Sequence, residues 1–143
     1  MSFGIILATH AHIGEALLEG AEMLAGKQDR VKALSLTEDT SVEQFEALFN
    51  ASYDTLRQSC DFIVVLCDIY GGSPFNVTSR TLLSGKELIA FTGVNLPILI
   101  DLLFSGDLTP DEVRAHVAET ASTSIQEVKV QFAEESEEDD LDL

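Results

Sequence analysis

The chain has 143 residues, of which 45% are hydrophobic, and its formal net charge is −17 at pH 7. A chain of this length and hydrophobic content is expected to form one domain with a packed core. The charge argues against nucleic acid as a partner, because such binding draws on Lys and Arg side chains that neutralise phosphates, and only eight of these residues are present.

Seven of the 25 acidic residues lie in the last ten positions, EESEEDDLDL, where apolar residues are few. We therefore predict a domain over residues 1–132 and a disordered acidic tail over residues 133–143. The N-terminus has no basic and apolar signal, and no apolar run approaches the roughly 20 residues needed to cross a bilayer. These features predict a cytoplasmic protein.

Strand-like and helix-like segments alternate along the chain. Strands are predicted at residues 3–8, 31–36, 61–67, 87–92 and 127–132. Helices are predicted to start near Ile13, after Ser41, at Ser73-Pro74, at Asn95 and at Thr109-Pro110. This alternation indicates an α/β fold with a doubly wound, mainly parallel sheet flanked by helices. The last segment, EVKVQF, alternates apolar and polar residues, which favours an edge strand with one face in water, one that another subunit could supply.

The first and third strands both end in residues that can carry chemistry. If these strands are neighbours, His10 in ATHAHIGE and Asp68 in CDIYGGSPFN share a crevice at the carboxyl ends of the strands, where α/β proteins bind ligands. A histidine whose Nδ1–H is held by a carboxylate presents Nε2 as an oriented nucleophile. We therefore predict that His10 accepts a phosphoryl group and that Asp68 orients it. His12 is expected to face solvent or to cap the next helix, and His116 to lie at the surface.

The segment after Asp68 has the features of an anion site. Gly71 and Gly72 allow close approach of the backbone, and Ser73 is expected to cap a helix whose free amides favour an anion. The Ser73 hydroxyl is predicted to donate a hydrogen bond to the phosphoryl group. The residues predicted to bind phosphate are Gly71, Gly72, Pro74, Phe75 and Asn76. No metal or cofactor is expected, because the chain has neither a G-x-x-x-x-G-K motif nor a kinase signature, so the phosphoryl donor should be another phosphoprotein.

Three other functions use the same residues. A serine hydrolase could combine Ser73, His10 and Asp68, but Ser73 is not in a G-x-S-x-G motif and Pro74 removes an amide from the oxyanion position. A receiver-like domain phosphorylated on Asp68 would need acidic residues after the first strand, where Thr9 and His10 stand. A regulatory module whose phosphorylation state is sensed by a transporter or regulator stays open.

Three stretches, GIILATHAHIGEALLEGAEMLAG, CDIYGGSPFNVTSR and FTGVNLPILID, resemble the enzyme IIA component of the mannose family of the bacterial phosphoenolpyruvate-dependent sugar phosphotransferase system. The resemblance extends from residue 3 to about residue 130. It implies that His10 is phosphorylated at Nε2 by the histidine-containing phosphocarrier protein and passes the group to a histidine of a IIB component, supported by Asp68 and Ser73. It also implies a homodimer that exchanges a C-terminal antiparallel edge strand.

The sequence departs from that family in two respects. The family often has glycine directly after the active histidine, whereas Ala11 stands here and predicts an ordinary backbone conformation. A IIB domain often follows IIA on the same chain, whereas only the acidic tail follows here. The IIB component is therefore expected to be a separate protein, with the membrane IIC and IID components reached indirectly, or the relay is regulatory and serves no sugar. Membrane components choose the sugar, so this chain does not specify it.

Overall fold

The computed structural model describes residues 1–130 of the chain. Strands and helices alternate, and the strands are β1 (Phe3–His10), β2 (Val31–Leu36), β3 (Phe62–Cys67) and β4 (Leu88–Thr92). The helices are α1 (Ile13–Ala25), α2 (Val42–Arg57), α3 (Gly72–Leu83), α4 (Leu96–Phe104) and α5 (Pro110–Thr123). The strands form a four-stranded sheet in the order β2-β1-β3-β4, and every pairing is parallel. The predicted doubly wound parallel sheet is confirmed.

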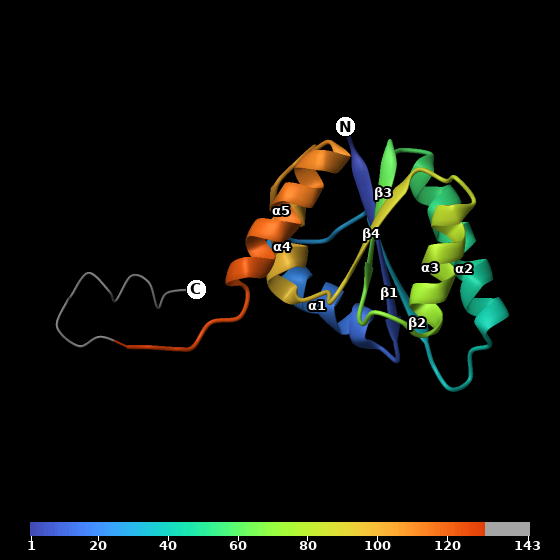
Figure 1. The fold of residues 1–143 in the computed structure, drawn as a ribbon, viewed down its shortest axis with the longest axis horizontal. Coiled ribbons are helices and arrows are strands. Elements are labelled where there is room, and N and C mark those ends of the chain that lie inside the picture. Colours follow the sequence, from blue (N-terminus) through green and yellow to red (C-terminus); the bar gives the residue numbers. More distant parts are fainter. Residues whose placement is uncertain (131–143) are drawn as a thin grey trace.

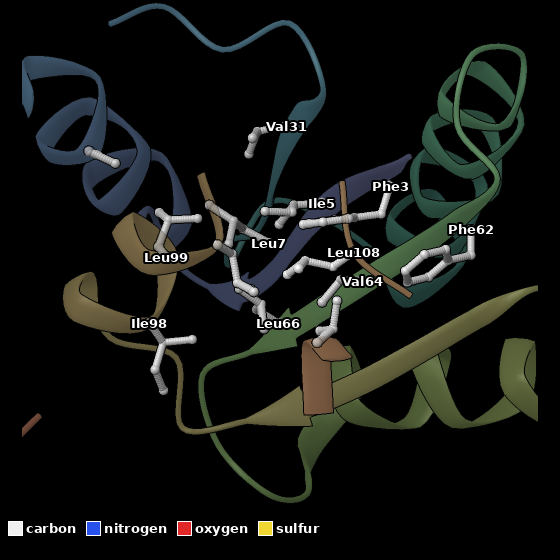
Figure 2. Packing of buried hydrophobic residues seen from close by; sticks show 13 residues of the cluster. Phe3, Ile5, Leu7, Val31, Phe62, Val64, Leu66, Ile98, Leu99 and Leu108 are labelled. Atoms are coloured by element: carbon white, nitrogen blue, oxygen red, sulfur yellow. The ribbon is translucent and has the colours of Figure 1, made fainter. Parts of the chain in front are cut away.

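Helices cover both faces of this sheet (Figure 1). α1, α4 and α5 lie on one face, whereas α2 and α3 lie on the other. Alternate residues of β1 accordingly belong to different cores: Ile5 and Leu7 to the first, Ile6 and Ala8 to the second. Figure 2 shows side chains of the first core, from β1, β3 and α4 among others. Burial on both faces is the reason why β1 and β3 are almost continuously apolar.

Several helix ends follow the signals in the sequence. Ser41 and Gln44 form the predicted capping box at α2, with the Gln44 N–H donating to Ser41 Oγ at 3.0 Å and the Ser41 N–H donating to Gln44 Oε1 at 2.8 Å. Asn95 caps α4 by accepting from the Ile98 N–H at 3.0 Å. Thr109 caps α5. No helix within residues 1–130 is long and apolar enough to cross a membrane.

The segment predicted as an edge strand, residues 127–132, forms no strand over its described part, residues 127–130. It leads away from the sheet beyond α5, and the Val128 and Val130 side chains are exposed (Figure 1). An edge strand needs the edge of a sheet for its backbone hydrogen bonds, and the single chain does not bring this segment to one. Residues 131–132, and the predicted tail over 133–143, lie outside the described residues.

The sheet order places a topological switch point at its centre. The chain leaves β1 toward β2 on one side, and leaves β3 toward β4 on the other. The loops after β1 and β3 therefore diverge and leave a crevice at the carboxyl ends of these strands, where open α/β sheets bind ligands. His10 and Asp68 lie at this point.

Candidate active site

His10 and Asp68 are joined by two hydrogen bonds across the switch point. His10 is the last residue of β1, and Asp68 directly follows β3. The backbone N–H of His10 donates to Asp68 Oδ2 at 2.9 Å, and His10 Nδ1 lies 2.9 Å from the same oxygen. Asp68 Oδ1 accepts from the Ile69 N–H at 3.0 Å. The structure thus brings together the two residues that the sequence pairs as acceptor and orienter.

The protonation state of Asp68 decides which tautomer of His10 is held. Burial opposes ionisation of this carboxyl group, but hydrogen bonds from the backbone and ring of His10, together with the charge of His10, outweigh it and lower the pKa of Asp68 below its usual value. An ionised carboxylate can only accept hydrogen bonds, so in the neutral imidazole the proton lies on Nδ1 and the lone pair on Nε2. The His10 side chain is 39% exposed and that of Asp68 only 11%, so the histidine is the accessible member of the pair.

Nε2 of His10 lies against the first residue of α3. A Cβ atom placed on Gly72 would be 3.1 Å from His10 Cε1 and 3.2 Å from Nε2, and Gly72 has a φ of +84°. Both the space and the backbone conformation therefore require glycine at this position. The nitrogen that carries the lone pair consequently faces the amino end of a helix, where backbone N–H groups lack partners within the helix and the helix dipole favours an anion.

The helix start differs from the prediction at Ser73. Gly71, with a φ of +100°, occupies the N-cap position, and α3 begins at Gly72. The prediction that Ser73 caps this helix is wrong, because the two glycines turn the chain into the helix two residues earlier than a serine cap would. Ser73 lies in the first turn, and no hydrogen bond within the described chain joins its side chain to His10. A Ser73-His10-Asp68 hydrolase triad is therefore not assembled.

The other residues predicted to bind phosphate occupy the first turn of α3 in different ways. Pro74 is buried, lacks an N–H and uses its carbonyl to accept from Thr78 Oγ1 at 2.8 Å, so it shapes the turn without donating a hydrogen bond. The Phe75 ring packs on that of Tyr70 with centroids 4.5 Å apart. Asn76 is exposed.

Ala11 does not adopt the ordinary backbone conformation that the sequence predicts. Its φ is +49°, in the left-handed region, at a cost of about 1–2 kcal/mol for a non-glycine residue. The Ala11 N–H continues the sheet ladder by donating to the Leu36 carbonyl at 2.8 Å, and α1 begins two residues later. The chain must therefore turn sharply at Ala11. The fold on either side sets the backbone conformation of this residue, and the preference of an alanine side chain does not.

Thr9 has a role in the loop after β1 that the sequence motifs do not indicate. Its side chain is fully buried, and its hydroxyl accepts from the Gly14 N–H at 2.8 Å, so Thr9 stabilises the amino end of α1 from the preceding strand. His12 occupies the N-cap position but makes no side-chain cap. It is exposed, as predicted, with Nδ1 3.2 Å from Glu15 Oε2. For Thr9, the available signal in the sequence was a threonine at the end of an apolar strand, beside a polar loop.

His116 pairs with a carboxylate of its own, away from this site. Its Nδ1 lies 2.9 Å from Asp101 Oδ2, which joins α5 to α4, and both side chains are partly exposed. Among residues 1–130, no group of three or more His, Cys, Asp or Glu side chains is arranged to hold a metal ion.

Comparison with known proteins identifies the family of this chain. Residues 4–118 match the model of a family described as "PTS system fructose IIA component", EIIA-man. The chain belongs to this family. The PTS mannose-specific EIIAB component of Escherichia coli K12 is 31% identical to this IIA chain over 138 residues, which cover 95% of the chain but only 42% of that relative. The chain thus spans less than half the length of that two-part protein.

One curated relative and two solved structures match over nearly their whole length. The PTS sorbose-specific EIIA component of Lacticaseibacillus casei is 23% identical over 137 residues, covering 93% of this IIA chain and 98% of that protein. Among solved structures, the PTS IIA protein associated with the fucose utilization operon of Streptococcus pneumoniae is 30% identical, with a TM-score of 0.77 and coverage of 89% and 93%. The mannose/sorbose-specific IIA subunit of Enterococcus faecalis, 22% identical, shares the fold with a TM-score of 0.80, covering 94% and 100%.

Proposed function

We propose that this IIA chain is a phosphoryl relay of a sugar phosphotransferase system. His10 accepts a phosphoryl group at Nε2 from the histidine-containing phosphocarrier protein and passes it to a histidine of a IIB component on a separate chain. The observation that supports this most directly is the 2.9 Å contact between Nδ1 and Asp68 Oδ2, because it leaves the lone pair on Nε2. Membership of the PTS IIA family supports the choice of reaction.

The transfer needs no cofactor, because one N–P bond replaces another. The Nε2 lone pair of His10 attacks phosphorus as the bond from phosphorus to the donor's histidine nitrogen breaks. The proton on Nδ1 stays in place, so the phosphorylated ring is cationic, and the Asp68 carboxylate stabilises this charge. Transfer to the IIB component is the same step in reverse, with the IIB histidine as the attacking nitrogen.

The amino end of α3 supplies the environment for the phosphoryl oxygens. Because Nε2 of His10 lies against Gly72, a phosphoryl group bonded to Nε2 would lie against the first turn of this helix. Backbone N–H groups of this turn and the Ser73 hydroxyl are available as donors, except at Pro74, which has no N–H. Positioning of this kind is the main contribution a protein makes to phosphoryl transfer.

An exposed apolar loop beside His10 fits a docking role. Ile69 and Tyr70 follow Asp68 directly, and they are 56% and 82% exposed. The phosphocarrier protein and the IIB component must each bring a histidine to the same Nε2, so they cannot bind together. We infer that both use Ile69 and Tyr70 in turn, because exposed apolar residues next to a reactive group are typical of protein contact sites.

We also propose that the chain works as a homodimer. Within the described residues β4 pairs only with β3, so its other edge is open. A cavity of about 260 Å³ lies beside this edge, lined by residues that include Phe75, Leu82, Ala90 and Phe91. If the EVKVQF segment of one copy paired with β4 of a second copy, its exposed valines would cover the apolar edge of that second copy.

The relay is tested by measuring intact mass after incubation with phosphoenolpyruvate, enzyme I and the histidine phosphocarrier protein. Wild type should gain one phosphoryl group that is lost in acid and survives base, and His10→Ala should gain none. His12→Ala is the matched control, because this exposed histidine lies two positions away, and it should gain the group as wild type does. Phosphate on His10→Ala, or a base-labile group on wild type, contradicts the proposal.

A further inference from the structure

The loop between β4 and α4, residues 93–95, holds the backbone of the residues behind the His10–Asp68 pair. The Gly93 N–H donates to the Asp68 carbonyl at 3.2 Å, and the Val94 N–H donates to the Cys67 carbonyl at 3.1 Å. The ladder between β3 and β4 has its last paired residues at Cys67 and Thr92. Beyond that point, the backbone of Asp68 is therefore supported by this loop.

The loop is in turn held by the two amide atoms of the half-buried Asn95 side chain. Asn95 Oδ1 accepts from the Ile98 N–H at 3.0 Å, which caps α4. Asn95 Nδ2 donates to Ser124 Oγ at 3.2 Å, and the Ser124 hydroxyl donates onward to the Ala121 carbonyl at 3.2 Å, at the end of α5. Asn95 thus joins the amino end of α4 to the carboxyl end of α5.

These contacts form a continuous support for the carboxylate that orients His10. The Asp68 carboxylate can hold the imidazole only if the backbone that carries it stays in place, and reactive groups need positioning within roughly 0.5 Å. The Asp68 carbonyl accepts from the Gly93 N–H, and Gly93 lies in the same short loop as Asn95, two residues before it. The cap to Ile98 alone fixes Asn95 to its own helix, whereas the bond to Ser124 fixes it to a second one.

We propose that Asn95 is a positioning residue for the phosphoryl transfer, and that it acts through its hydrogen bond to Ser124. This bond holds the 93–95 loop, the loop holds the backbone of Asp68, and Asp68 holds Nδ1 of His10. The proposal rests on the proposed phosphoryl acceptor, but its structural part concerns the His10 ring and can be measured without any transfer.

Two variants remove the bond from opposite sides. Ser124→Ala removes the acceptor and leaves the α4 cap intact. Asn95→Ser keeps a good cap residue, but its side chain is too short to reach Ser124. If the shared bond is what matters, the two variants should have the same effect, and the double variant should be no worse than either one.

A third variant separates positioning from loss of stability. Thr109→Ala removes the cap at the other end of α5, beside Met1, whose carbonyl accepts from the Leu108 N–H at 3.0 Å. This change should lower the melting temperature by roughly 3–6 °C. It should leave the tautomer and the phosphorylation rate of His10 unchanged, because Thr109 lies at the end of the sheet opposite to His10.

The first measurement is the tautomer of His10, from the ring ¹⁵N chemical shifts of the unphosphorylated full chain. Wild type and Thr109→Ala should show the proton on Nδ1, whereas Ser124→Ala and Asn95→Ser should shift toward an average of both tautomers. The second is phosphorylation by the phosphocarrier protein, where the same two variants should lose roughly tenfold in maximal rate at an unchanged half-saturating donor concentration.

The outcomes distinguish the two proposals. If wild type takes up no phosphoryl group, the relay fails, and the tautomer measurement still decides whether Asn95 positions the ring. If wild type is phosphorylated but Ser124→Ala and Asn95→Ser match it in tautomer and rate, the role of Asn95 is overturned. A loss in Thr109→Ala equal to that in Ser124→Ala would also overturn it, because the effect would then follow stability.

Discussion

The Asp68 carboxylate stabilises the fold and orients His10 through the same hydrogen bonds. Its pKa is lowered in the folded chain, so its contribution to stability is complete above the unfolded value of about 3.9 and is lost as the pH falls through the folded value. We expect Asp68→Asn to be less stable than wild type at pH 7, and the difference to shrink below about pH 4. Phosphoryl transfer by the variant should fall roughly 10- to 100-fold, because a neutral amide holds the ring less firmly.

Urea unfolding from pH 3 to 7, with the transfer rate measured at neutral pH, checks this expectation. The exposed Asp29 provides the control, because Asp29→Asn removes a carboxylate of the same kind at a distance from the site. A difference between wild type and Asp68→Asn that stays constant down to pH 3 would contradict the assignment.

At the scale of elements, the amino end of α3 meets Nε2 only because Gly72 has no side chain. Gly72→Ala should reduce phosphorylation of His10 by roughly 10²-fold, since the added methyl would lie 3.2 Å from Nε2 and displace the ring. Gly85→Ala is a matched control: Gly85 also has a positive φ, +88°, but an added Cβ would have nothing within 4 Å.

Both glycine variants should lose about 1–2 kcal/mol of stability from backbone strain, but only Gly72→Ala should lose activity. Thermal unfolding and the rate of phosphoryl uptake, measured on the same samples, separate these effects. Equal rates for the two variants would show that α3 is not in contact with the phosphoryl group.

At the scale of the whole molecule, the free edge of β4 predicts a dimer. Sedimentation equilibrium at micromolar concentration should give twice the 15.5 kDa chain mass. A chain ending at residue 126, which lacks EVKVQF, should be monomeric, whereas one ending at residue 132 should stay dimeric, because it loses only the acidic tail. A monomeric wild type, or a dimer that survives removal of residues 127–143, would contradict the exchange.

Local patterns in the sequence were sufficient for most of the architecture. The four strands of the sheet and the capping box at Ser41 follow from side-chain period and cap chemistry, which act over a few residues. The closeness of His10 and Asp68 also followed, because parallel α/β topology brings the carboxyl ends of neighbouring strands to one edge. The start of α3 at Gly72, in place of the predicted cap at Ser73, did not follow from local patterns. Two consecutive glycines can adopt many conformations, and the packing against His10 selects one of them.

By itself, the sequence determined the fold class, the strand and helix order and the pairing of His10 with Asp68. Only the tertiary structure decided the left-handed backbone at Ala11, the role of Thr9 at α1 and the bond from Asn95 to Ser124. Side-chain period and cap chemistry report the conformations that a residue prefers within its own segment. These three features depend instead on what the fold brings next to a residue, up to 29 positions away along the chain.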